Sequence, residues 1–314
     1  MKKLISLFLA TMLLVSVIPL GSISANAATK YTEGYYTYTV SNGEATITDC
    51  DTSISGEIEI PSVLGGYPVT SIGMQAFIYC NSLTSVVIPD SVITIDYVSF
   101  GYCTSLISVI LPNSLTNIGN SAFRACIALQ DITIPDSVTT IEGNAFTDCS
   151  SLTSLNIPQS VKSIGDYAFQ YCSSLSSIIV PDSVTSIGKG AFSGCSSLTT
   201  ITIPDSLTII NDYTFQDCSL ITSIIIPDSV TSVGSHAFYG CSSLEMAVVG
   251  NNVTSINNYA FGGCKSLVSV AIGINVTSIG YGAFSDCPLT TVYYCGTYTQ
   301  WKGISIGDNN WYLY

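Results

Sequence analysis

The sequence is poor in charge, and poorest in positive charge. Only 9% of its 314 residues are charged, and eight Lys and Arg stand against 21 Asp and Glu, which gives a net charge of −13. Binding to a phosphate backbone requires clustered cations. The composition therefore excludes nucleic acid as a partner and leaves neutral or basic protein surfaces open.

Patterns typical of catalytic and metal sites are also scarce. The chain has a single histidine, His236, and its 12 cysteines never occur in the C-x₂-C spacing of zinc sites. We recognise no Ser/His/Asp set, paired carboxylates or phosphate-cradling glycine loop. We therefore predict that the protein is not an enzyme and holds no cofactor or metal, and we interpret His236 as a solvated surface residue.

Apolar runs long enough to span a bilayer are missing after residue 20. The first 27 residues contain, in order, two lysines, an apolar run from Leu4 to Leu20 and the small-residue site ANA at 25–27. This order is typical of a secretory signal peptide, so we predict cleavage before Ala28. A membrane anchor is the alternative, and Pro19 argues against it. We expect a secreted, extracellular or cell-surface protein that is not inserted in the membrane once the signal is removed.

What the sequence has instead is one repeated phrase. The segment "IPQSVKSIGDYAFQYCSSLSS" is followed by "VPDSVTSIGKGAFSGCSSLTT" and "IPDSLTIINDYTFQDCSLITS", each 23 residues after the last. Ten phenylalanines and ten cysteines keep this period in phase. A period in the twenties with leucine-like positions is the signature of a leucine-rich repeat solenoid. These residues are Phe77, Phe100, Phe123, Phe146, Phe169, Phe192, Phe215, Phe238, Phe261 and Phe284, with Cys80, Cys103, Cys126, Cys149, Cys172, Cys195, Cys218, Cys241, Cys264 and Cys287.

Each unit predicts its own backbone path. Leu198, Ile201 and Ile203 follow the L-x-x-L-x-L spacing of a short strand with inward apolar side chains, and Pro204 ends that strand. A Gly or Asn before the "AF" segment predicts a left-handed bend, and "AF" itself predicts a short helical turn. We therefore predict an α/β leucine-rich repeat solenoid. It would be a curved, right-handed stack with a parallel concave β-sheet, and with short strands or helical turns on the other side.

Both ends of such a stack need caps, because a terminal unit exposes its apolar face. We predict an N-terminal β-hairpin cap over 28–56, turning at Asn42-Gly43. About ten 23-residue repeats follow over 57–286, and an aromatic C-terminal cap covers 287–314. Trp301 and Trp311 can seal this end, and an aromatic sugar-binding platform is the alternative.

Two ladders of reactive side chains each allow two interpretations. We interpret the ten in-phase cysteines as small buried hydrophobes rather than disulfides, because ladder neighbours lie a full strand spacing apart. Cys50 and Cys295 stand outside this ladder. A carboxylate recurs after the proline and favours an Asx-type turn over a Ca²⁺ site. Its members are Asp90, Asp136, Asp182, Asp205 and Asp228.

The motif "IPDSVTSIGxxAFxxCSSLTS" resembles the BspA-like leucine-rich repeat family, the treponemal-type class of 23-residue repeats. The resemblance extends from about Glu57 to Asp286. The resemblance implies an exported bacterial surface protein, and some members of the family are linked to adhesion to host matrix proteins and to other cells. It supplies no catalytic residue.

One residue per unit should point outward from the strand face. Six of the nine are apolar, and Ser or Thr flanks most of them, which suggests a protein-binding surface with a polar rim. The alternative is that β-branched residues stand there for strand propensity alone. The nine are Val87, Ile110, Thr133, Asn156, Ile179, Thr202, Ile225, Val248 and Ala271.

The sequence thus predicts a non-enzymatic, adhesin-like leucine-rich repeat protein. Its partner would be a host matrix or cell-surface protein bound on the concave face. A structural envelope component that associates with itself is the second hypothesis. Carbohydrate binding through the C-terminal aromatics is the third.

Overall fold

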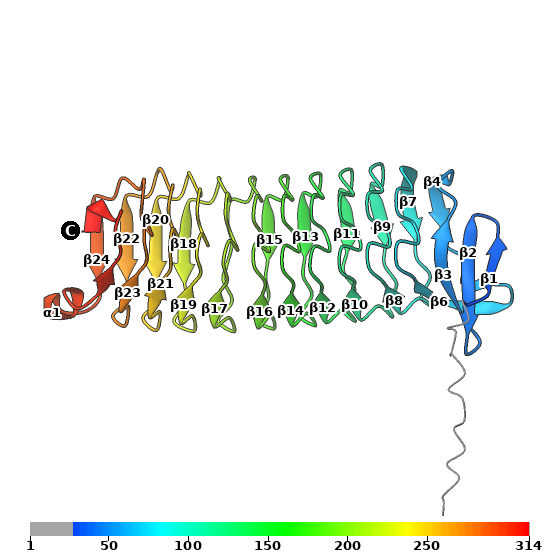
Figure 1. Ribbon diagram of the computed structural model, residues 1–314, viewed down its shortest axis with the longest axis horizontal. Coiled ribbons are helices and arrows are strands. Elements are labelled where there is room, and N and C mark those ends of the chain that lie inside the picture. Colours follow the sequence, from blue (N-terminus) through cyan, green and yellow to red (C-terminus); the bar gives the residue numbers. More distant parts are fainter. Residues whose placement is uncertain (1–27, 314) are drawn as a thin grey trace, which may run out of the picture.

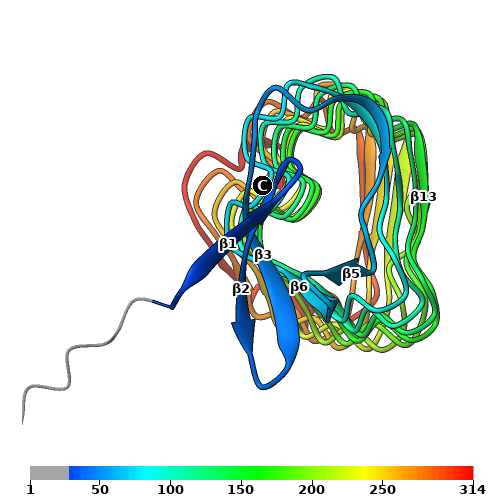
Figure 2. The ribbon, with the colours of Figure 1, turned by 90° about the vertical axis from the view of Figure 1, so that its right-hand side faces the viewer.

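The computed structural model describes residues 28–313, so the predicted signal peptide lies outside the described residues. The chain winds into a β-solenoid whose turns lie side by side in one nearly straight row (Figure 1). Seen along this row, successive turns superimpose as a closed outline around a shared interior (Figure 2). Each turn contributes one strand to each of two parallel sheets, except that the turn around residues 201–204 contributes none to the first of them.

The first sheet, here called the face sheet, contains the strands that follow the L-x-x-L-x-L spacing. Hydrogen-bonded pairing divides it into three pieces. Its strands are β4 (Ser55–Glu59), β7 (Ser82–Val87), β9 (Ser108–Ile110) and β11 (Asp131–Thr133); β13 (Ser154–Asn156) and β15 (Ser177–Ile179); and β18 (Ser223–Ile226), β20 (Met246–Val249), β22 (Ser269–Ile272) and β24 (Thr291–Tyr294).

The second sheet, here called the short-strand sheet, consists mostly of two-residue strands and has two pieces. Within each piece, strands from neighbouring turns pair in parallel. The strands are β6 (Tyr67–Ile72), β8 (Thr94–Ile95), β10 (Asn117–Ile118), β12 (Thr140–Ile141), β14 (Ser163–Ile164) and β16 (Ser186–Ile187); then β17 (Ile209–Ile210), β19 (Ser232–Val233), β21 (Ser255–Ile256), β23 (Ser278–Ile279) and β25 (Ser305–Ile306).

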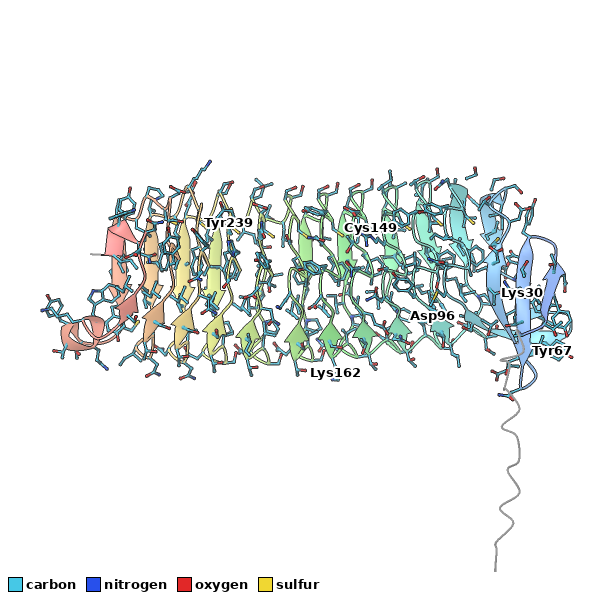
Figure 3. All side chains as sticks on the ribbon, in the orientation of Figure 1. Lys30, Tyr67, Asp96, Cys149, Lys162 and Tyr239 are labelled. Atoms are coloured by element: carbon cyan, nitrogen blue, oxygen red, sulfur yellow. The ribbon has the colours of Figure 1, made fainter. Side chains whose placement is uncertain are left out.

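The core is a set of ladders that run the length of the stack. The ten in-phase phenylalanines are at most 1% exposed, and neighbouring rings stack with centroids 4.8–5.6 Å apart. Beside them, the thiol of Cys172 donates a hydrogen bond to the carbonyl of Phe146 in the preceding turn, at 3.2 Å. Side chains fill the interior along the whole row, Cys149 among them (Figure 3).

The helical part of the α/β assignment is not confirmed. The segment around "AF" forms hydrogen-bonded turns between the two sheets, and these turns contain left-handed residues such as Tyr167 (φ 57°) and Tyr171 (φ 58°). A right-handed helix cannot run through two left-handed residues four positions apart. Within 28–313 the only α-helix is α1 (Tyr298–Trp301), with one 3₁₀ helix, η1 (Trp311–Leu313), after it.

The glycine that recurs before the "AF" segment does not adopt the left-handed conformation predicted for it. Gly188 does not have a positive φ; the left-handed residue is Gly190, two positions later. A Cβ on Gly188 would lie 2.4 Å from the backbone nitrogen of Asp166 in the preceding turn. Glycine is therefore required here because neighbouring turns approach closely, and the predicted left-handed bend at this position is wrong.

Three strands cover the N-terminal end of the stack. β2 (Tyr36–Ser41) and β3 (Glu44–Cys50) pair antiparallel across Asn42-Gly43, and both turn residues have positive φ. β3 then pairs in parallel with β6, and the ring of Tyr36 packs edge-on against Phe77 at 6.2 Å. The first phenylalanine of the ladder is thereby covered. β1 (Lys30–Glu33) is the outer edge strand, and β5 (Val63–Leu64) pairs with β6.

The C-terminal end is closed by one tryptophan and one asparagine. Trp301 is partly buried and packs on Tyr294, with ring centroids 5.5 Å apart. The buried Asn310 donates to the carbonyls of Gly280 and Gly307 and accepts a hydrogen bond from the Phe284 amide. Trp311 is 74% exposed, so the expectation that it seals this end is wrong.

Candidate protein-binding face

The nine residues predicted to point outward, here called the stripe, lie along the outer surface of the face sheet. Strand alternation sets their direction: Val109 is buried and Ile110, next to it, is 60% exposed. Ile179 and Ile225 are 71% and 66% exposed. Val87, Val248 and Ala271 are partly exposed, and the remaining members are exposed. Three large aliphatic side chains therefore face solvent on one line.

Strand register aligns the stripe turn by turn. Ile110 lies between Val87 and Thr133, and Val248 lies between Ile225 and Ala271. In a second piece of the sheet, Asn156 is opposite Ile179. Thr202 lies outside the assigned strands. On the flank, the hydroxyls of Ser85 and Ser108 form a hydrogen bond at 2.9 Å, within a polar rim beside the stripe.

The stripe ends at a residue that sequence analysis missed. Tyr293 pairs with Ala271 and is 63% exposed. A fixed 23-residue period points instead to Tyr294, because the last unit is one residue shorter. The available signal was the separation of Cys287 from Leu289, which is one residue less than that of Cys264 from Leu267.

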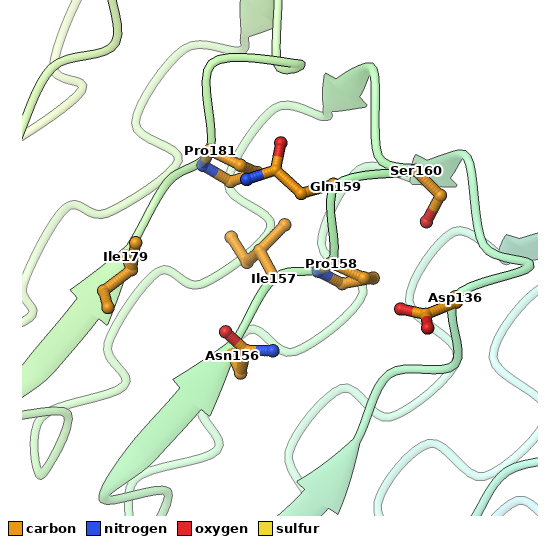
Figure 4. Close-up of a pocket in the computed structure, with 8 residues that line it drawn as sticks. All are labelled: Asp136, Asn156, Ile157, Pro158, Gln159, Ser160, Ile179 and Pro181. Atoms are coloured by element: carbon orange, nitrogen blue, oxygen red, sulfur yellow. The ribbon is translucent and has the colours of Figure 1, made fainter.

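The stripe is hollowed where the face sheet is interrupted between β11 and β13. A strand hollow of about 300 Å³ lies over these strands and β15, and it includes Asp131 and Thr133. A larger Gln159 hollow of about 570 Å³ lies at the strand ends (Figure 4). Asn156 and Ile179 line both. The Gln159 hollow is lined by Asp136, Asn156, Ile157, Pro158, Gln159, Ser160, Ile179 and Pro181.

Two of the five carboxylates after the proline bond to the next turn. Asp90 accepts a hydrogen bond from the backbone amide of Asn113 at 2.9 Å, and Asp228 accepts one from Asn251. The Asx-turn interpretation, in which each carboxylate serves its own turn, is therefore wrong for these two. Among residues 28–313, no group of three or more His, Cys, Asp or Glu could hold a metal ion.

The ladder cysteines are buried thiols that bond to main-chain carbonyls. From Cys103 to Cys287, each donates to the phenylalanine carbonyl of the preceding turn at 3.0–3.2 Å. Burial raises the pKa of Cys126, Cys195 and Cys241 to about 12. Of the two cysteines outside the ladder, Cys50 is buried and Cys295 is exposed.

His236 is not a solvated surface residue, so that interpretation is wrong. Its imidazole is partly buried and stacks between the rings of Tyr213 and Tyr259, with centroids 5.1 Å away on each side. Burial lowers the pKa of His236. The sequence signal was the 23-residue step, which relates His236 to these two tyrosines.

No helix within residues 28–313 has both the length and the apolar character that crossing a membrane requires. The geometry instead presents an extended, mostly apolar outer surface with a polar rim.

Comparison with known proteins agrees with this architecture. Residues 70–199 and 185–306 match a family model described as a BspA type leucine-rich repeat region. Among solved structures, a leucine-rich cell surface protein from Faecalibacterium prausnitzii is 30% identical, over 90% of this chain and 99% of that one, with a TM-score of 0.52. None of the curated proteins matches the sequence.

Two further structures resemble the chain. A leucine-rich repeat protein from Bacteroides ovatus is 27% identical over 83% of this chain and 88% of that one, with a TM-score of 0.60. A leucine-rich repeat protein from Eubacterium ventriosum is 20% identical over 84% and 96%, with a TM-score of 0.51, and shows the fold alone.

Proposed function

We propose that this chain, which belongs to the BspA-type leucine-rich repeat family, is a non-enzymatic, adhesin-like protein that binds other proteins through its stripe. The similarity to a bacterial cell surface protein supports a secreted or cell-surface location. The partner is a host matrix protein or a cell-surface protein.

The observation that carries the proposal is the exposure of Ile110, Ile179 and Ile225 on one face. Burying an isoleucine side chain contributes about 1.5–3 kcal/mol. Strand propensity alone would be met as well by threonine, which is β-branched and costs less to expose. An apolar centre with a hydroxyl rim matches the composition of protein interfaces.

The test uses mature protein, residues 28–314, and a variant with all three isoleucines changed to glutamate. A matched control carries Thr116→Glu, Thr185→Glu and Thr231→Glu, which add the same charge to exposed positions six residues further along the chain. Circular dichroism establishes that all three fold. Binding is then measured to immobilised matrix proteins and to whole host cells.

We expect the native protein and the threonine control to bind and the isoleucine variant to lose binding. Equal binding by both variants would overturn the proposal. Sedimentation of the native protein tests the self-association hypothesis in the same samples, because an envelope component would form large species at micromolar concentration.

A second candidate, carbohydrate binding, is favoured by the exposed rings at the C-terminus. Trp311, Tyr298 and Tyr312 are 74%, 72% and 55% exposed, and Trp301 already packs against the end of the stack. This candidate predicts glycan binding that survives the isoleucine changes and is lost in Trp311→Ala. Absence of glycan-array binding by the native protein would exclude this candidate, and binding retained by Trp311→Ala would exclude Trp311 as part of its site.

A further inference from the structure

The Gln159 hollow holds polar groups that the fold leaves without partners. Within 28–313, the Asp136 carboxylate has no hydrogen bond and no ion pair, whereas Asp90 at the same ladder position accepts two hydrogen bonds from Asn113. The next turn carries Gln159 at this position and donates none to Asp136. Ligand contacts are therefore still available to this carboxylate.

A buried hydroxyl beside it is also unsatisfied. Ser137, Ser183 and Ser206 each donate to a backbone carbonyl 22 residues earlier, at 2.5–2.9 Å. The equivalent hydroxyls of Ser91, Ser160 and Ser229 are buried and have no hydrogen-bond partner, and of these three only Ser160 lines a hollow described above. In Figure 4 the Ser160 hydroxyl points toward the side of the hollow occupied by the Asp136 carboxylate. An unpaired buried polar group is costly, so a ligand atom that pairs with it gains affinity.

The charge of the hollows has one sign. Asp136 and Asp131 are their only charged lining residues, and the whole chain carries −13. Ile157, Ile179 and Pro181 add apolar walls beside these carboxylates. The combination suits a side chain with an apolar stem and a cationic head.

We propose that the Gln159 hollow receives a lysine or arginine side chain of the bound protein, an inference that rests on the proposed binding function of the stripe. The cationic head lies between the Asp136 carboxylate and the side-chain oxygens of Asn156, Gln159 and Ser160. Its methylene stem packs along Ile179. The stripe supplies apolar contact to either side, and this hollow selects the partner by charge.

The experiment selects ligands without assuming a natural partner. A library of linear peptides is panned on immobilised mature protein and counter-selected against the triple Ile110, Ile179 and Ile225 to Glu variant, so that retained peptides depend on the stripe. Individual peptides are synthesised with their basic residue intact, and with arginine replaced by citrulline or lysine by norleucine. Affinities are measured for the native protein, Asp136→Asn and the control Asp205→Asn.

Asp205 makes a suitable control because it occupies the same ladder position three turns away, is exposed and lies outside both hollows. We expect the retained peptides to share a lysine or arginine. Neutralising it should weaken binding to the native protein by about tenfold or more, the scale of a hydrogen bond to a charged group. Asp136→Asn should weaken binding of the basic peptide by the same factor, and this variant should bind the basic and the neutral peptide with equal affinity. Asp205→Asn should bind both peptides as the native protein does.

Two results would overturn the inference, and they differ in what else they reject. Stripe-dependent peptides without a basic residue, or with equal affinity for Asp136→Asn and Asp205→Asn, reject the cationic subsite and leave the binding function standing. Failure to recover any stripe-dependent peptide rejects both.

Discussion

Cysteine and phenylalanine act together in every turn at the residue scale. The Phe146 carbonyl accepts the Cys149 amide of its own turn and the Cys172 thiol of the next turn. Both lone pairs of a buried carbonyl are thereby used, and the second bond joins neighbouring turns. Cysteine suits this position because its thiol is a small hydrophobe that can still donate weakly.

Burial should protect the thiols from reagents. Of the 12 cysteines, only Cys295 is exposed. Iodoacetamide at pH 8 should label the folded protein once, at Cys295, because alkylation needs an accessible thiolate. Mass spectrometry of Cys295→Ser should then show no label, whereas urea-unfolded protein should take up the remaining 11. Rapid labelling of folded Cys295→Ser would contradict the buried ladder.

Alkaline conditions should destabilise the fold through the same residues. Burial raises the folded pKa of Cys195 from the ordinary thiol value of 9.0 to about 12. Its contribution is therefore fully present below pH 9 and is lost as pH rises toward 12, at about 1.4 kcal/mol per pH unit. Urea unfolding of native protein and Cys195→Ala, between pH 8 and 10.5, measures it. The variant should lose less stability over this range, and parallel curves would contradict the pKa assignment.

At the scale of elements, both sheets are interrupted at the same level. Gly188 and Gly234 donate their amides to Ile164 and Ile210 in the preceding turns. At the intermediate turn, the Asn211 side-chain amide instead donates to the Ile187 carbonyl at 2.6 Å. β16 and β17 are unpaired there, and no strand is assigned to residues 201–204 opposite. Asp96, Glu142 and Asn257 also carry side chains at this position, but their backbone amides keep the bond to the preceding turn and their strands stay paired. The loss of pairing therefore coincides with the side-chain bond of Asn211 and not with a side chain as such.

This level should exchange amide hydrogens faster than its neighbours. Opening is easiest where backbone hydrogen bonds are fewest. We expect the amides of residues 201–203 and Asn211 to exchange about tenfold or more faster than those of 224–226 and Gly234, as measured by NMR. Equal amide protection along the array would show that the interruption does not lower local stability.

A methyl group at a closely approached glycine should weaken the stack. Gly188→Ala places Cβ 2.4 Å from the Asp166 nitrogen, so the turns must separate, at a cost of about 1–3 kcal/mol. Urea unfolding measures the loss. Lys189→Ala, at the exposed neighbouring residue, is the control and should stay within about 0.5 kcal/mol of the native protein. Equal stability of the two variants would mean that the turns adjust freely.

The solenoid and its stripe were predictable because each depends on a period. Strand alternation is local, so Ile110 and Ile225 could be assigned outward without knowing the fold. The structural reason for glycine at position 188 could not be predicted, because it depends on the distance between turns. The Gln159 hollow could not be predicted either, because it depends on the Asp136 carboxylate making no hydrogen bond to the next turn.

At the scale of the whole molecule, the two ends of the array are the exceptions to its regularity. Each internal turn is covered by two neighbours, but the terminal turns need other elements to cover them. Tyr36 covers the phenylalanine ladder at one end, and Trp301 and Asn310 close the other. These closing residues belong to no repeat, so the repeat pattern cannot predict their geometry.

Removing the C-terminal cap should therefore cause self-association. A chain ending at residue 294 lacks α1, β25 and η1, and it exposes the last phenylalanine, Phe284, and the edge of β23. Sedimentation velocity should show oligomers or aggregates of this truncation. The control, Trp311→Ala in the full chain, should sediment as the native protein, because Trp311 is exposed. A monomeric truncation would mean that the cap has another role.

The regular bonding between adjacent turns also bears on how this protein can evolve. The phenylalanine stacks and the thiol–carbonyl bonds join each turn only to its immediate neighbours, so an internal turn is nearly interchangeable with the next. In-frame duplication or loss of one 23-residue coding segment, by recombination between the related copies, would lengthen or shorten the stripe by one position and leave the caps intact. The length of the binding surface would thus be inherited as the number of repeats in the gene.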